Sequence, residues 1–256
     1  MKRVLPIANI IALVVTVAIN YLSITGVFNG NTMALQSARY PTLFTPAPWA
    51  FSIWGVIYLA LGAFVVYQAR DNEDARELQR RIGWWFLASC IANSCWVIVW
   101  MYDQGGLSVL VMAFLLFTLV KIILRTDMEL TDPPLRTIAF VWWPFCLYSG
   151  WITVAMITNI SAVLVKWGWS GAGLEPETWA VVMAIVAGLI YLLMTWKRNM
   201  REYASVGAFG LFAVGMADVH RAPAVATTAF VVAGILVVSS GLHGYRNRAY
   251  SPFRKR

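Results

Sequence analysis

Charged residues are scarce in this sequence. Only 12% of the 256 residues are Asp, Glu, Lys or Arg, about half the fraction that is typical of soluble chains. Together with 60% hydrophobic residues and a mean hydropathy of +0.67, this deficit excludes a soluble enzyme and a disordered chain. Three cysteines are too few for a secreted disulfide scaffold. The composition therefore indicates a protein that crosses a membrane several times.

Residues that carry catalytic or metal chemistry are equally sparse. The chain has two histidines, Cys90 and Cys95 have poor spacing for a shared metal site, and Cys146 stands alone. The sequence shows no phosphate-binding glycine loop and no nucleophile elbow. The apolar segments also lack the row of carboxylates that an ion-coupled carrier needs. We therefore expect no catalytic residue, no bound metal and no required cofactor.

Long apolar segments, by contrast, are abundant. Because a membrane-spanning helix needs about 20 mostly apolar residues, the sequence predicts an all-α polytopic membrane helix bundle with eight spans. The predicted spans are residues 5–28, 48–69, 82–102, 106–125, 137–160, 177–196, 203–219 and 223–243. Pro144 predicts a kink or tilt in the fifth span, because proline removes a backbone hydrogen bond. We expect a five-helix domain over 1–168, followed over 169–256 by a glycine-rich connector, three spans and a basic tail.

The basic residues predict the orientation of these spans. With eight spans, both termini share one side with loops 70–81, 121–136 and 197–202. This side holds 17 of the 20 Lys and Arg residues, and only Arg39, Lys166 and Arg221 lie elsewhere. Short loops rich in Lys and Arg stay in the cytoplasm. We therefore expect a multi-pass protein of the cell membrane with cytoplasmic termini, whose positive charge faces lipid headgroups rather than nucleic acid.

Aromatic residues are unusually frequent, and several lie inside the spans rather than at the membrane interface. Three spans each carry a set of mostly aromatic residues at helical spacing, which places each set on one helix face. The sets are Phe51, Trp54 and Tyr58; Asn93, Trp96 and Trp100; and Pro144, Tyr148 and Trp151. Membrane helix interfaces favour small residues, so these faces would either interlock as ordinary packing or line a cavity for a flat lipophilic molecule.

Three sequence runs add a family resemblance. Residues 44–58 read FTPAPWAFSIWGVIY and resemble the signature of the TspO/MBR family, the tryptophan-rich sensory or translocator proteins. IANSCW at 91–96 is similar to the third-helix Asn-x-x-Trp element of that family, and PFCLYSGW at 144–151 is similar to its fifth-helix element. The runs follow the family's order over about residues 5–165. The chain is thus identified as a long form of this family with a C-terminal extension.

The resemblance implies a five-helix bundle with a pocket that binds a porphyrin or haem-type tetrapyrrole. With the helical spacing above, the expected ligand-binding residues are Trp49, Phe51, Trp54, Tyr58, Asn93, Trp96, Tyr148 and Trp151. Arg39 in the first outer loop is a candidate partner for a ligand carboxylate. The leading hypothesis is a non-enzymatic membrane receptor or regulator that holds a small, planar hydrophobic ligand.

Other functions remain open at this point. The chain is long enough for a transporter of a hydrophobic metabolite, an enzyme that degrades bound porphyrin with light or oxygen, or a scaffold for another protein. Gly207, Gly210 and Gly215 allow close helix contacts. Such contacts would lie either within one chain or between the two chains of a homodimer.

Overall fold

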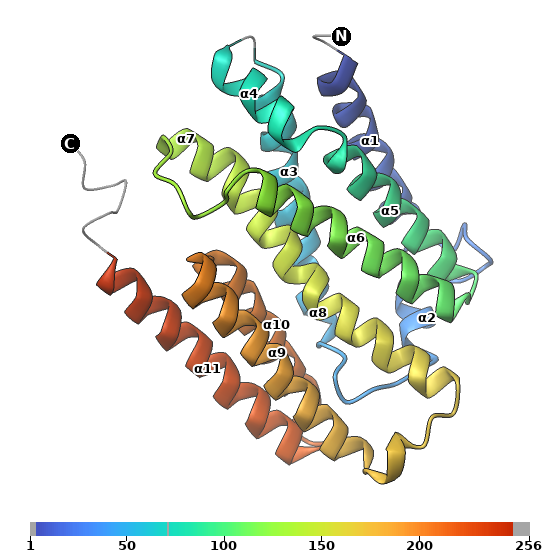
Figure 1. The fold of residues 1–256 in the computed structure, drawn as a ribbon. Helices are drawn as coiled ribbons and strands as arrows, with labels where there is room; N and C mark the ends of the chain where they lie inside the picture. The colour runs from blue at the N-terminus through green and yellow to red at the C-terminus, as the bar shows by residue number, and fades with distance from the viewer. Residues whose placement is uncertain (1–3, 71, 248–256) are drawn as a thin grey trace.

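The structure is a computed structural model that describes residues 4–70 and 72–247, which form helices joined by turns (Figure 1). A long helix occupies the place of each predicted span. These helices are α1 (Val4–Leu22), α3 (Ile53–Gln68), α5 (Trp85–Met101), α6 (Gly105–Arg125), α8 (Trp143–Lys166), α9 (Pro176–Arg198), α10 (Arg201–Asp218) and α11 (Pro223–Arg246). The shorter elements are α2 (Met33–Ala38), η1 (Pro48–Ser52), α4 (Glu73–Ile82), α7 (Leu135–Thr137), η2 (Ile138–Trp142) and η3 (Gly171–Gly173).

Within the described part of the chain, six helical segments are long and apolar enough to cross a membrane. The number rises to seven if α4 and α5, which meet at a bend of 54°, form one span. Helix α10 carries Arg201, Glu202 and Asp218 at its ends, which lowers its membrane-spanning character. An all-helical membrane protein is thus confirmed, whereas eight spans and cytoplasmic termini stay predictions. The predicted basic tail beyond residue 247 lies outside the described residues.

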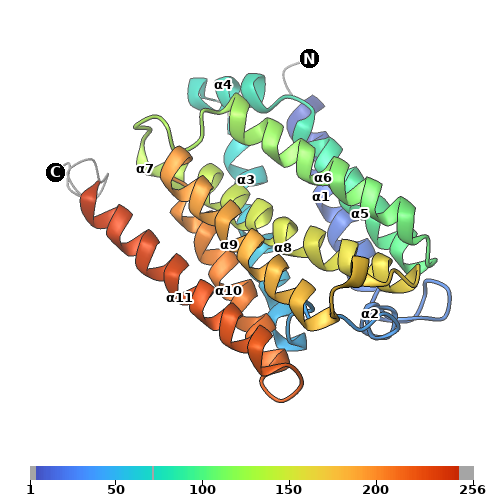
Figure 2. The ribbon, with the colours of Figure 1, turned by 60° about the horizontal axis from the view of Figure 1, so that its bottom comes forward.

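Helix α8 is the centre of the bundle. On one side it packs against α3 and α6, with α1 and α5 beyond them, and on the other side it packs against α10, with α9 and α11 beyond (Figures 1 and 2). More than half of its most apolar window is buried, the largest share among the candidate spans. One hydrophobic core runs through both sides and includes Phe86 of α5, Phe145 of α8 and Leu211 of α10.

Small residues bring the helices around α10 together. A Cβ atom added to Gly150 of α8 would lie 2.9 Å from the side chain of Val206 on α10. The predicted small residues have similar neighbours, which are Tyr191 beside Gly207, Val154 beside Gly210 and Phe230 beside Gly215. All of these neighbours belong to the same chain. The predicted close contacts therefore form within the bundle, while a homodimer stays a prediction.

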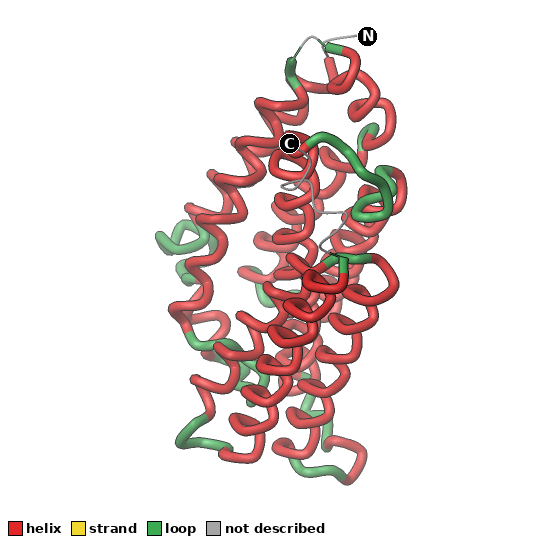
Figure 3. The backbone as a smooth tube through the Cα atoms, turned by 90° about the vertical axis from the view of Figure 1, so that its left-hand side faces the viewer, coloured by secondary structure: helices red, strands yellow, loops and turns green. Residues whose placement is uncertain are grey.

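The structure refines the first predicted span at its end and the fifth predicted span at Pro144. Helix α1 ends at Leu22 rather than near residue 28, and the chain continues in turns in which Gly26, Asn29 and Gly30 adopt a left-handed backbone. Just before Pro144, where a kink or tilt was predicted, the chain forms the π-helical turn η2, and residues 135–166 remain one candidate span. A π-helical turn absorbs the hydrogen bond that proline cannot donate. Figure 3 shows the long helices aligned along one common direction.

Candidate functional site: an aromatic cluster and an adjoining groove

The first group of predicted site residues lies between α1, α3, α5 and α8. Trp54 and Tyr58 stack with ring centroids 5.2 Å apart, and the Trp54 ring meets Tyr148 edge-on at 6.0 Å. The hydroxyl of buried Tyr148 accepts a hydrogen bond of 3.1 Å from Asn93 Nδ2. Asn93 Oδ1 in turn accepts one of 2.8 Å from Asn20 Nδ2. Sequence reasoning found four of these residues but missed Asn20, which belongs to none of the three runs.

The second group joins η1 and α8 to α10. Trp151 is 2% exposed and contacts the ring of Phe51 at 5.8 Å and that of Phe209 at 6.3 Å. Phe209 also meets Trp49 at 5.5 Å, and Trp49 reaches Phe212 at 6.4 Å. Trp49 itself remains 47% exposed. Helix α10, from the C-terminal part of the chain, thus supplies rings to the cluster that the N-terminal part begins.

Trp96 is placed differently from the other predicted residues. Its ring stacks on Trp100 with centroids 6.3 Å apart, and its Nε1 donates a hydrogen bond of 3.4 Å to Asn159 Oδ1. Asn159 also exchanges hydrogen bonds with Ser108 of α6. Trp96 therefore packs against both the main core and a second hydrophobic cluster that contains Trp100, and its described ring contact is with Trp100.

Arg39 belongs to a polar network formed by α2, the turn between α5 and α6, and the end of α8. It is exposed and donates a hydrogen bond of 3.3 Å to Gln36 Oε1. Asp103 is the centre of this network, because it pairs with Lys166 Nζ at 2.9 Å and accepts hydrogen bonds from Gln36 and Tyr40. Burial alone would raise the pKa of Asp103, but these donors outweigh burial and lower it below its ordinary value. A role for Arg39 toward a ligand stays a prediction.

An apolar groove opens between α10 and α11, beside the aromatic cluster. Its volume is about 750 Å³. It is lined by Ser205, Ala208, Phe209, Phe212, Phe230, Ala233, Gly234, Val237 and Val238. Phe209 and Phe212 also contact Trp49, so the groove adjoins the predicted residues although none of them lines it. The spacing of three residues between Phe209 and Phe212 predicts that both lie on one face of a helix. Nothing in the sequence indicates that this face pairs with α11.

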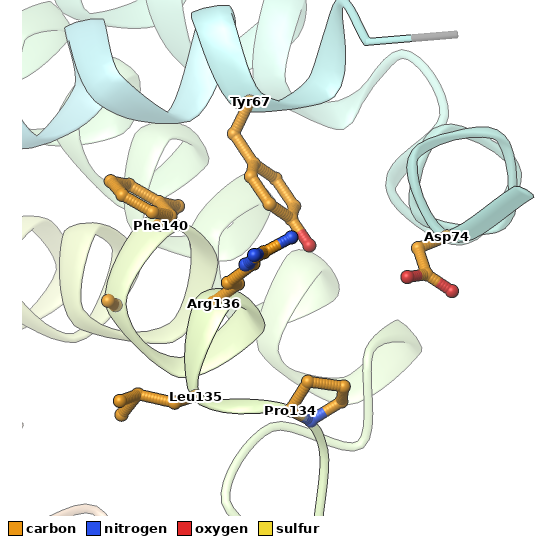
Figure 4. A pocket seen from close by; sticks show the side chains of 7 residues that line it. Tyr67, Asp74, Pro134, Leu135, Arg136 and Phe140 are labelled. Atoms are coloured by element: carbon orange, nitrogen blue, oxygen red, sulfur yellow. The ribbon is translucent and has the colours of Figure 1, made fainter. Parts of the chain in front are cut away.

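A second cavity, of about 600 Å³, lies where α3 and α4 approach the start of the α7–α8 run (Figure 4). Tyr67 and Phe140 stack at its wall with centroids 5.6 Å apart. Figure 4 shows Arg136 beside the Tyr67 hydroxyl and Asp74 facing them from α4. None of the predicted ligand residues lines this cavity. Its mixed charges distinguish it from the apolar groove.

The helical fold, its membrane-crossing segments and the buried ring cluster define a polytopic helical membrane protein. The chain belongs to a known family of this class, since the family model described as TSPO-like protein matches residues 6–242. The match extends from α1 into α11 and includes the three helices that follow residue 176. No curated protein and no solved structure matches the chain significantly.

Proposed function

We propose that this protein is a non-enzymatic membrane receptor for a planar hydrophobic molecule such as a porphyrin or haem-type tetrapyrrole. The observation that carries the proposal is the continuity between the predicted aromatic residues and an open apolar groove of ligand size. Membership of the TSPO-like family supports a membrane protein of this kind. The ligand lies in the groove, and Trp49 stands at its margin.

The packing of the inner rings supports this location. Tyr148 and Trp151 are each 2% exposed and touch neighbouring rings directly, so a flat ligand would have to displace them to lie among them. The groove already offers about 750 Å³, within the usual range for ligand pockets. Phe209, Phe212 and Phe230 give it three rings on which a flat molecule can stack.

The groove also faces the phase in which such a ligand dissolves. Val237 and Val238 of α11, a candidate span, are about 60% exposed although both are apolar. On a helix that crosses a membrane, such side chains face lipid tails. A hydrophobic molecule can therefore enter sideways from the bilayer, and the ring faces then hold it against α10.

The test is a binding titration of the purified chain in detergent with protoporphyrin, followed by quenching of tryptophan fluorescence. Gly234→Leu fills the groove, because a Cβ at Gly234 meets nothing within 4 Å and the fold has room for the side chain. We expect it to weaken binding about tenfold or more. Gly241→Leu is the matched control, since Gly241 lies on the same helix, is equally unobstructed and does not line the groove.

Two further outcomes distinguish an error in the proposed binding location from an error in the proposed receptor function. If Gly234→Leu binds like the parent while Trp54→Ala loses binding, the ligand enters the inner rings and the groove assignment is wrong. If the parent protein shows no saturable quenching by protoporphyrin or haem, the receptor proposal itself fails. Circular dichroism of each variant verifies that its helices are intact.

A further inference from the structure

Three side chains that can ligate a metal meet where α8 approaches the start of α10. Glu129 comes from the loop after α6, Cys146 lies one turn into α8, and Glu202 lies in the first turn of α10. One carboxylate oxygen of each glutamate and the Sγ atom of Cys146 all lie within 4.8 Å of one another. The receptor proposed above uses none of these residues.

Burial sets this cluster apart from an ordinary group of surface acids. Glu129 is 7% exposed and Cys146 is fully buried. Glu129 Oε1 and Glu202 Oε2 are buried without a hydrogen-bond partner among the described residues. Because an unpaired buried carboxylate is costly, its persistence here indicates that a ligand completes the group.

Side chains from the end of α9 anchor the backbone that carries Glu129. Asn199 Nδ2 donates a hydrogen bond of 3.2 Å to the carbonyl oxygen of Glu129, and Arg198 donates one of 3.3 Å to that of Met128. Both donors come from the end of α9 and its junction with α10. The Cys146 thiol lies 3.9 Å from the Met128 sulfur. The loop after α6 is therefore tied to the end of α9 and contacts α8 at Cys146.

We propose that Glu129, Cys146 and Glu202 form a binding site for a divalent transition metal ion, with Zn²⁺ as the best match. Thiolate and carboxylate are both zinc ligands, and three protein ligands leave a fourth tetrahedral position for water. Zinc bonds of about 2.3 Å to sulfur and 2.1 Å to oxygen place these atoms about 3.6 Å apart. Small side-chain rotations reach this distance from the observed separation.

The charges of the site balance when the ion is bound. The three ligands carry −3 in their ligating forms and Zn²⁺ carries +2, which leaves −1. Arg201 lies within electrostatic reach of Glu129 and supplies the compensating positive charge. The ion would link the loop after α6 and α8 to α10. It therefore acts as a clamp between the two groups of helices that flank α8.

The decisive experiment uses the full chain in detergent, freed of any affinity tag and stripped with a chelator, and titrates it with Co²⁺. Ligation by a thiolate produces a ligand-to-metal charge-transfer band in the near ultraviolet, and added Zn²⁺ should remove it by displacement. We expect one ion per chain. If the parent protein gives no such band and retains no Zn²⁺ after dialysis, the site does not exist.

Variants assign the ligands. Cys146→Ser should abolish the Co²⁺ band, and Glu129→Gln and Glu202→Gln should each weaken Zn²⁺ binding about tenfold or more. Cys90→Ser is the matched control, because Cys90 is also a buried thiol in a helix but lies outside the cluster. Unchanged metal binding by Cys146→Ser, or loss of the band in Cys90→Ser, would overturn the assignment. The titration of the parent protein decides the question even if a variant misfolds.

Discussion

The two groups of helices that flank α8 pack by opposite means. On the N-terminal side, Phe64, Phe86 and Phe145 meet with ring centroids 4.9 to 5.9 Å apart. On the C-terminal side, glycines remove the side chain, so that the Gly188 backbone approaches Val232 and the Gly207 backbone approaches Tyr191. Large rings hold the helices apart and fill the space between them, whereas glycines let the helix backbones approach closely. No neighbouring atom lies within 4 Å of a Cβ built at Gly234, and here the helices leave an open groove.

This difference predicts opposite sensitivities. A ring-packed region loses contacts when a side chain is shortened, because the surrounding rings collapse only partly into the void. A glycine-packed region is damaged when a side chain is added, because the neighbouring group has no room to move. The following substitutions test this contrast, from the largest expected effect to the smallest.

Trp151→Ala should have the largest effect. Trp151 is 2% exposed and contacts both Phe51 and Phe209, so its removal leaves a large void between α8 and α10. We expect a loss of about 3–5 kcal/mol in the free energy of unfolding, measured as a lower midpoint of thermal unfolding by circular dichroism in detergent. Trp167→Ala, at a 65% exposed position, is the control. Equal midpoints for the two variants would contradict ring packing at this position.

Gly207→Ala should have an intermediate effect. The added Cβ would lie 2.5 Å from atoms at the base of the Tyr191 ring. This ring cannot move freely, because the Tyr191 hydroxyl donates a hydrogen bond of 2.8 Å to the carbonyl oxygen of Gly150. The cost should be about 1–3 kcal/mol, read from the same thermal midpoint. Gly241→Ala has open space around it and should melt like the parent, so a common midpoint for both variants refutes close packing at Gly207.

Asp103→Asn, in the polar network of the loops, should have the smallest effect on stability. This effect should depend on pH and change only under acid conditions. The pKa of Asp103 is lower in the folded chain than in the unfolded chain, so the folded state binds fewer protons. The stabilisation is therefore complete above the ordinary value of 3.8 and is lost as the pH falls through the lowered value. Asp103→Asn should reduce the difference in thermal midpoint between pH 7 and pH 3. Asn tolerates the left-handed backbone at this position, where φ is +61°.

Control measurements sharpen this last prediction. The ion pair with Lys166 is partly exposed, so salt should weaken it and shrink the effect. If Asp103→Asn and the parent lose the same stability between pH 7 and pH 3, the network does not contribute to folding.

Much of the fold follows from local pattern. Runs of about 20 apolar residues predicted the positions of all eight long helices, and spacing within one helix correctly placed Trp54 and Tyr58 on a shared face. Such features depend only on neighbours in the chain, because helix periodicity and the cost of an unpaired backbone in lipid act locally. The same local rules fail at helix ends, where α1 ends at Leu22 although its span was predicted to reach residue 28.

Contacts between distant segments could not be obtained in this way. Glu129, Cys146 and Glu202 are 17 and 56 residues apart, so no ligand spacing is visible along the chain, and Cys146 was expected to stand alone. The groove depends likewise on the pairing of Phe209 with Gly234 across two helices. Sequence reasoning assigned the rings to helix faces, but it did not show that α10 would cover Trp151.

By itself, then, the amino-acid sequence determined that this chain is an all-helical membrane protein, where its helices lie and which faces carry the aromatic rings. Only the tertiary structure decided that these rings touch one another, that the open space lies between α10 and α11, and that two glutamates meet a cysteine. The physical reason is that hydropathy and helix periodicity are properties of each segment alone. Cavities and ligand clusters arise from the shapes that segments present to one another.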